Sequence, residues 1–256
     1  MSRITGHHVY LSGGGIKGAY QYGFFQELYR QRPAFEIKRL YTVSIGSINA
    51  LPILTKRMDI LETYWDAKDG THPMDLITHK WSPEPVSWLS HLVNLKTRGA
   101  LFKGLQRRIF EEFIRQIPPN EIKAIRRKWV IVSFDERRQH TVFTRCTDEK
   151  TIVDAIVASS RYPGIFPRDD LDTRIDGAFS KWLPPIDHRH DWLIIDLQDK
   201  TRCPEAKHVR CRSYSPKIAR VPGFNTTTCI LTNRPLIQHL IQNGIEDGAR
   251  FADTIP

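Results

Sequence analysis

Two strand-to-helix turns near the start of the chain constrain its fold more than any other feature. Residues 8–12 and 37–43 are short apolar runs of strand character, and each gives way at a turn to a segment with helical periodicity. The first turn is rich in glycine and the second is built around Ser44. Two strand–turn–helix units in direct succession predict two strands of one sheet whose turns lie side by side.

The first turn holds three consecutive glycines, Gly13, Gly14 and Gly15. They allow backbone angles that a Cβ would forbid, and they leave amide N–H groups uncovered at the start of a helix. Such a helix start attracts negative charge. Lys17 and Gly18 follow in the first helical turn. For Lys17 two interpretations stay open: a solvated surface lysine, or a side chain that contacts a substrate phosphate or holds the loop.

The second turn places Ser44 between a strand that ends at Val43 and a helix that begins at Ile45, with Gly46 shortly after. In a nucleophile elbow, this arrangement lifts a hydroxyl out of the backbone while neighbouring N–H groups face the reacting carbonyl. Taken alone, Ser44 is better explained as a helix N-cap, a position that favours serine. Beside an anion-binding turn, however, an exposed serine indicates acyl transfer.

Four sequence motifs carry a family resemblance. In chain order they are GGGIKG, SIGSINA, ASSRYPGIFP and DGA. They resemble the patatin-like phospholipase family, whose pattern is GGGx(R/K)G, GxSxG, ASxxxPxxFP and DG(A/G), and the resemblance covers residues 8–185. It implies a three-layer α/β fold with a mainly parallel central sheet flanked by helices. It also implies a lipid acyl hydrolase that cleaves fatty-acyl esters of phospholipids or related lipids.

The acidic motif RIDGA puts Asp176 directly before Gly177. In isolation this pair is typical of a plain turn. The resemblance implies that Asp176 and Ser44 form a catalytic dyad, and no motif links a histidine such as His140 or His188 to Ser44. Because the reference pKa of an aspartate is about 4, Asp176 must be partly desolvated, or tightly paired with Ser44, to act as the base.

The remaining site residues belong to the same motifs. The amides of residues 13–15, together with that of Ile45, are candidates for an oxyanion hole. Support of the loops or of the substrate is assigned to Lys17, Gly18, Gly46 and Gly177. No cofactor or metal is expected. Thr42 stands where the family usually has glycine, which supports the alternative of a catalytically inactive member that binds lipid or a protein partner.

Two other classes of function are less well supported. Gly13, Gly15 and Gly18 satisfy the GxGxxG pattern of a dinucleotide-binding turn, but the second strand ends in YTVS without the required acid. The net charge of +10, from 38 Lys and Arg against 28 Asp and Glu, favours a negative partner. The sequence offers no nucleic-acid reading element, whereas an anionic membrane surface fits both the charge and the serine chemistry.

Length and composition favour a single domain over residues 1–256. No apolar run approaches the roughly 18 residues of a membrane-spanning helix, and no secretory h-region is present, so we expect a cytoplasmic protein with transient peripheral contact with membranes. Cys146, Cys203, Cys211 and Cys229 are unevenly spaced, which favours reduced thiols over a disulfide framework or a metal site. Nothing in the sequence indicates an oligomeric state.

The rest of the chain alternates between expected elements and surface segments. Helices are expected at 59–68, 105–117, 152–159 and 236–252, a hairpin at 129–134 and 140–144, and a strand at 192–197. Residues 123–128 and 200–224 are interpreted as solvated surface. Residues 70–101 have Trp88, Leu92 and Leu95 at helical spacing, which fits either core packing or an apolar flap that rests on a bilayer.

Overall fold

The computed structural model describes residues 6–66, 107–108, 110–163, 172–180, 183–184, 186–187, 189–198, 211–216 and 234–255. Residues 70–101, with their alternatives of core packing and flap, lie outside the described residues. In the part of the chain that is described, no helix combines the length and the apolar character needed to cross a bilayer.

A central sheet organises the described residues. Its strands are β1 (His7–Leu11), β2 (Ile37–Val43), β3 (Trp129–Asp135), β4 (His140–Arg145), β5 (Arg174–Asp176), β6 (Trp192–Ile195) and β7 (Cys211–Tyr214). They lie in the order β4-β3-β2-β1-β6-β7, with β5 paired to β3. The pairs β3–β2, β2–β1, β1–β6 and β6–β7 are parallel. Strands β4 and β5 run antiparallel to β3. The mixed α/β fold with a mainly parallel central sheet is therefore confirmed, and β2 has the predicted bounds.

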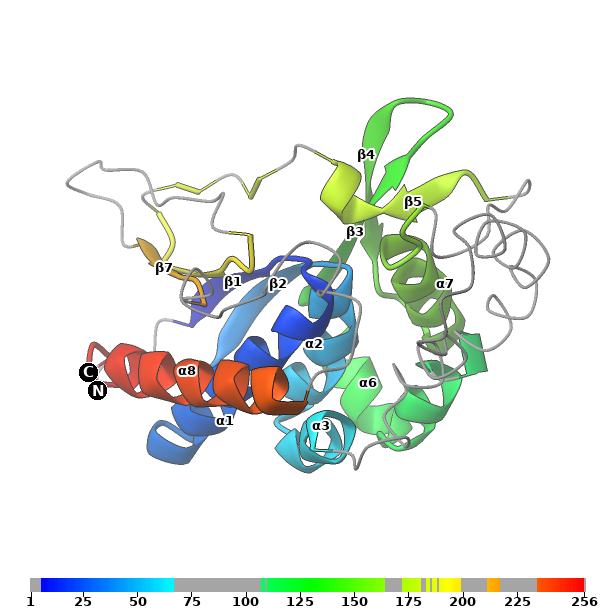
Figure 1. Ribbon diagram of the computed structural model, residues 1–256. Helices are drawn as coiled ribbons and strands as arrows, with labels where there is room; N and C mark the ends of the chain where they lie inside the picture. The colour runs from blue at the N-terminus through cyan, green and yellow to red at the C-terminus, as the bar shows by residue number, and fades with distance from the viewer. Residues whose placement is uncertain are drawn as a thin grey trace, which may run out of the picture.

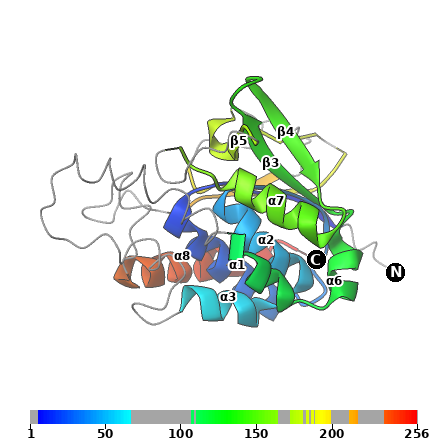
Figure 2. The same ribbon diagram turned by 90° about the vertical axis from the view of Figure 1, so that its right-hand side faces the viewer.

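Helices flank this sheet. They are α1 (Gly18–Gln31), α2 (Ile45–Thr55), α3 (Met58–Trp65), α6 (Pro119–Ile125), α7 (Glu149–Ser159) and α8 (Arg234–Ala252), with short 3-10 turns η1 (Gly15–Lys17) and η2 (Gly177–Phe179). Figure 1 shows α8 lying alongside α1. In both views the β3–β4 hairpin extends beyond the helices (Figures 1 and 2).

The two faces of the sheet bury different amounts of apolar surface. Alternate side chains of the inner strands, such as Leu11, Leu40 and Ile131, join a large cluster with the helices. The side chains between them form a small cluster on the other face, made of Tyr10, Val43, Val132 and Ile194. Strands β3 and β6 are buried along most of their length and read as nearly continuous apolar runs, whereas β2 keeps an exposed Lys38 near its start.

Two expectations from the sequence are wrong, and one helix was not expected. Residues 119–125 form the unexpected helix α6, which begins at Pro119 and buries Ile122 and Ile125, whereas Lys123 and Arg127 are exposed, as expected of a solvated surface. Residues 211–214 form strand β7 rather than a surface excursion. Cys211 is disulfide-bonded, and its partner lies outside the described residues, whereas the buried Cys146 is a free thiol.

Helices α1 and α8 pack with almost no space between their backbones. A Cβ added to Gly244 of α8 would lie 2.2 Å from the carbonyl oxygen of Tyr20, so only glycine permits this approach. The Tyr20 hydroxyl also donates a 2.5 Å hydrogen bond to the buried carboxylate of Asp247. Since α1 continues directly from the glycine turn, this contact fixes the helix that carries one wall of the site.

Gly244→Ala tests this packing. Alanine favours an isolated helix by about 1 kcal/mol over glycine. Overpacking at the contact with Tyr20 should cost about 1–3 kcal/mol or more, so we expect a net loss of stability in urea unfolding. Gln242→Ala, an exposed position of the same helix, is the control and should stay near the parent. A Gly244→Ala protein more stable than the parent would contradict the close approach.

Candidate active site

The backbone at Ser44 has the strained geometry of a sharp turn. Its φ is 53° and its ψ is −124°, a conformation that a residue with a Cβ rarely adopts. Ser44 occupies the N-cap position of α2, but its side chain makes no capping hydrogen bond. A Cβ on Gly46 would lie 2.5 Å from the Leu11 carbonyl oxygen, so the turn requires glycine there. The hydroxyl of Ser44 is thus turned away from its own helix.

Asp176 supplies the partner for that hydroxyl. It ends strand β5 with 2% of its surface exposed, and its carboxylate accepts a hydrogen bond from the Ser44 side chain. A second hydrogen bond comes from the Ala178 N–H at 2.8 Å. Burial raises the pKa of Asp176 to about 6, although both hydrogen bonds oppose this rise. At neutral pH the carboxylate is mostly ionised and is a stronger base than an exposed aspartate.

Strand register explains how two distant residues meet. Val43, which precedes Ser44, pairs with Val132 of β3. The next residue of β3, Ser133, stands opposite Asp176. A Cβ on Gly177 would lie 2.4 Å from the Val132 carbonyl oxygen, so the chain turns tightly against β3 directly after the acid. Strand β3 therefore aligns the serine and the carboxylate.

The glycine turn lies against the same serine. A Cβ built on Gly13 would be 2.9 Å from the Ser44 Cβ and 3.7 Å from its Oγ. The amide groups of Gly13 and Gly14 donate to no backbone carbonyl within the described residues. Gly15 adopts a positive φ of 56°. The structure thus brings Gly13 and Ser44 together, and within the described residues the amides of Gly13 and Gly14 have no backbone acceptor.

Two further predicted residues support this turn. Lys17 donates a 3.1 Å hydrogen bond from Nζ to the carbonyl oxygen of Leu197, directly after β6. This contact is the one that a loop-holding role requires. Gly18 lies against the elbow helix, because a Cβ there would be 2.4 Å from the Ile45 side chain. The two strand-to-helix turns are therefore packed on each other.

A buried polar network lies beneath the elbow. Thr42 is fully buried, and its hydroxyl oxygen accepts hydrogen bonds from Trp129 Nε1 and from Ser47 Oγ, each 2.9 Å long. Ser159 accepts the backbone N–H of Ser44 at 2.9 Å and donates to the Val132 carbonyl oxygen at 2.6 Å. Thr42 is therefore held by its neighbours, and a side chain at this position is compatible with the turn at Ser44.

Sequence reasoning assigned no role to Ser159 or Trp129. Ser159 lies in the ASSRYPGIFP motif, which was a usable signal. The contact of Trp129 with Thr42 joins residues 87 positions apart, so no local sequence pattern could predict it. Of the histidines considered, His140 stands opposite Asp135 on the hairpin, and His188 lies outside the described residues. Within the described residues, no three His, Cys, Asp or Glu side chains are grouped so that they could hold a metal ion.

Comparison with known proteins identifies the family. The model of the family described as patatin-like phospholipase matches residues 9–187. The chain belongs to the patatin-like phospholipase family. No curated protein matches it significantly.

This patatin-like protein is also similar to two solved structures. VipD from Legionella pneumophila is 12% identical with a TM-score of 0.46, covering 97% of this chain and 67% of that one. ExoU, in the ExoU–SpcU complex of the Pseudomonas aeruginosa type III secretion system, is 16% identical with a TM-score of 0.46, covering 98% and 52%. The patatin-like chain thus spans about two thirds of VipD and about half of ExoU.

Asp176→Asn should change the pH dependence of stability. The pKa of Asp176 is raised from 3.8 to about 6, so its contribution is present below pH 3.8 and is lost as pH rises through 6. We expect the Asn variant to be more stable than the parent at pH 7 by up to about 3 kcal/mol, with no difference below about pH 4. Urea unfolding across this range is the measurement.

Asp172→Asn is the matched control, with the opposite sign. Burial tends to raise the pKa of Asp172, but hydrogen bonds from Arg174 and the charge of Arg161 outweigh it and lower the pKa. This variant should therefore lose stability at pH 7, and the loss should shrink toward acid pH. A parent protein as stable as Asp176→Asn at pH 7 would contradict the raised pKa of Asp176.

Proposed function

We propose that the protein is a serine-dependent lipid acyl hydrolase in which Ser44 is the nucleophile and Asp176 the general base. The observation that carries this proposal is the hydrogen bond between the Ser44 side chain and the buried Asp176 carboxylate, beside the glycine turn. Membership of the patatin-like phospholipase family supports a fatty-acyl ester, of a phospholipid or related lipid, as the substrate.

The geometry supports a two-step mechanism. Ser44 Oγ attacks the ester carbonyl carbon while Asp176 accepts the hydroxyl proton. The tetrahedral intermediate collapses, the carbon–oxygen bond to the leaving alcohol breaks, and Asp176 returns the proton to that alcohol. Water then attacks the acyl-serine while Asp176 accepts its proton. The bond between the acyl carbon and Ser44 Oγ breaks, and Asp176 returns the proton to Ser44 as the fatty acid leaves. No cofactor takes part in this sequence.

Charge stabilisation falls to the glycine turn in this proposal. The carbonyl oxygen becomes negative in the tetrahedral intermediate, next to the amides of residues 13–15 and of Ile45. Each well-aligned donor of this kind contributes about 2.7–4 kcal/mol to the transition state. The N–H of Ser44 itself donates to Ser159, so it is already engaged. The raised pKa of Asp176 strengthens the base that this chemistry needs.

The surroundings of Asp176 favour a lipid surface as the source of substrate. Tyr162 and Phe179 are 40% and 43% exposed, and the centroids of their rings are 5.1 Å apart. Leu183 is also exposed. Phe179 ends the 3-10 turn that follows Asp176, so an exposed aromatic pair lies close in the chain to the acid. Together with a net charge of +10, they suit transient contact with an anionic bilayer.

Substitution of the dyad tests the activity. Ser44→Ala and Asp176→Asn should each lower kcat for short-chain ester and phospholipid hydrolysis by about 10³-fold or more, because nucleophile and base act as a unit. Ser213→Ala, an exposed serine on β7, is the control and should keep parental kcat. Hydrolysis at the parental rate by Ser44→Ala would overturn the proposed function.

The double variant Tyr162→Ser, Phe179→Ser tests the lipid contact. Loss of two exposed aromatic rings should weaken binding to vesicles of anionic phospholipid and lower the hydrolysis of vesicle lipid. Hydrolysis of a monomeric short-chain ester in the same preparation should be unchanged, which controls for folding. Parental vesicle binding by the double variant would show that this surface does not contact lipid.

A further inference from the structure

The strand that carries the proposed base is short. Strand β5 has three residues, Arg174 to Asp176, and it pairs with β3 along one edge. On the β3 side, the Thr173 carbonyl oxygen accepts the N–H of Glu136 at 3.1 Å. In an extended chain, alternate residues direct their backbone polar groups to opposite edges. Residues 172, 174 and 176 therefore direct theirs away from β3, where a further strand would otherwise lie.

Arg161 takes the place of that further strand. Its Nη1 donates to the carbonyl oxygens of Asp172 and Arg174, at 2.7 and 2.9 Å. Its own carbonyl oxygen accepts the N–H of Asp176 at 2.9 Å. Arg161 thus satisfies three of the outward backbone groups of the segment that ends in the base, and the outward N–H of Arg174 donates to Asp172 Oδ1 at 3.1 Å. Unpaired groups of this kind are costly when buried.

The guanidinium of Arg161 is itself buried. The side chain is 5% exposed, and its Nη2 forms an ion pair with Asp172 at 3.7 Å. Asp172 also accepts two hydrogen bonds from the Arg174 guanidinium, 2.8 and 3.0 Å long. A buried cation needs such partners, because an unpaired charge in the interior is strongly unfavourable. The position of Arg161 is therefore well determined.

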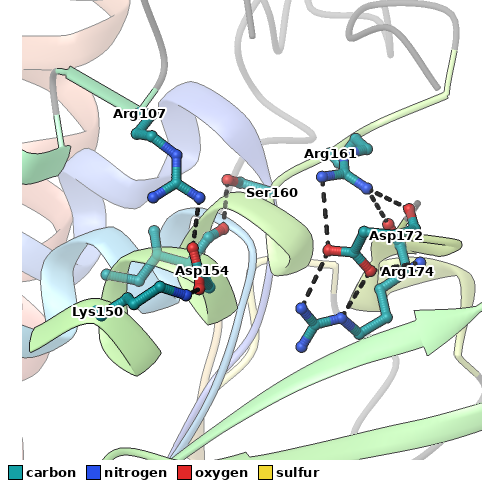
Figure 3. A network of polar contacts seen from close by, with 8 residues as sticks. Arg107, Lys150, Asp154, Ser160, Arg161, Asp172 and Arg174 are labelled. Carbon is teal, nitrogen blue, oxygen red and sulfur yellow. Dashed lines mark hydrogen bonds and ion pairs between the residues drawn. The ribbon is translucent and has the colours of Figure 1, made fainter. Parts of the chain in front are cut away.

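A second network near α7 provides a comparison. Figure 3 shows Arg107 paired with Asp154, which also binds Lys150, apart from the group of Arg161, Asp172 and Arg174. Arg107 is 43% exposed, and the contacts shown for it are to α7 rather than to β5. Both arginines hold aspartates, but only Arg161 binds the backbone that leads to Asp176.

We propose that Arg161 is a positioning residue for Asp176: it holds the open edge of β5 and thereby fixes the carboxylate against the Ser44 hydroxyl. The catalytic part of this inference rests on the proposed function. The positional part does not, because it concerns the location and burial of one carboxyl group.

Loss of the guanidinium would loosen β5 along the edge that β3 does not cover. The carbonyl oxygens of Asp172 and Arg174 would lose their donor, and water would reach Asp176. Because burial is the largest cause of its raised pKa, the pKa of Asp176 would fall from about 6 toward its ordinary 3.8. Tyr10, whose pKa is raised by burial and by Asp196 and Asp176, stays neutral in this pH range.

The test uses Arg161→Met, Arg161→Lys and the control Arg107→Met. For a soluble short-chain ester, Arg161→Met should lower kcat by about 100-fold with little change in KM, as expected for a misplaced catalytic group. The acid limb of the kcat profile should move from about pH 6 toward 4, because a base of lower pKa stays ionised in more acidic solution. Arg107→Met should match the parent in kcat and in the position of the limb.

Arg161→Lys keeps the charge but cannot reproduce the planar fork. Its kcat and acid limb should lie between those of the parent and Arg161→Met, and it serves as the test if the Met variant does not fold. A purely structural role would reduce the amount of active protein without moving the limb. An acid limb and kcat equal to those of Arg107→Met, in whichever Arg161 variant folds, would overturn the proposal.

A carbon-13 NMR titration of the Asp176 carboxyl separates this proposal from the proposed function. A lowered pKa in the Arg161 variants supports the positioning role even if Ser44→Ala retains activity, in which case only the proposed hydrolase fails. An unchanged pKa in the Arg161 variants, combined with an inactive Ser44→Ala protein, leaves the hydrolase standing and rejects the role of Arg161.

Discussion

The hydrogen bond between the Ser44 side chain and the Asp176 carboxylate is the contact on which the rest of the site depends. A carboxylate with 2% exposure is tolerated only where donors reach it, and Ser44 and Ala178 supply them. The same burial makes the carboxylate a stronger base. Stability and reactivity are therefore in conflict at this residue, as is common where a fold holds catalytic groups.

One strand of the sheet supports both Ser44 and Asp176. Strand β3 pairs with the strand that precedes Ser44 and with the strand that ends in Asp176. The unusual backbone of Ser44 is supported by Ser159, which binds its N–H, and by Gly46, which lets α2 begin against β1. On the other side, the buried Arg161 binds the edge of β5 that no strand of the described residues covers. Neighbouring groups thus hold each half of the proposed dyad.

Much of the fold could be predicted, and so could the meeting of the glycine turn, Ser44 and Asp176, because the informative signals were local; the catalytic roles of these residues stay a prediction. The run 37–43 is followed by the turn at Ser44 and forms β2 with the predicted bounds. The four motifs marked the residues that meet near this turn. Helix α6 was missed because it is short and is followed by the basic residues 126–128, which obscured the buried pair Ile122 and Ile125. Strand β7, with the sequence CRSY, is too short and too polar to be predicted from its sequence pattern. The contacts of Trp129 and Arg161 depend on tertiary structure, so periodicity could not reveal them. The single-domain organisation stays a prediction.

The most direct measurement of the central claim is covalent labelling with a fluorophosphonate probe, with the modified residue located by mass spectrometry. The account predicts one adduct, on Ser44. It also predicts that the labelling rate rises through about pH 6 as Asp176 ionises, and that Asp176→Asn abolishes this rise. An unlabelled Ser44 in folded protein, or labelling that is indifferent to Asp176, would contradict the account and favour a catalytically silent member of the family.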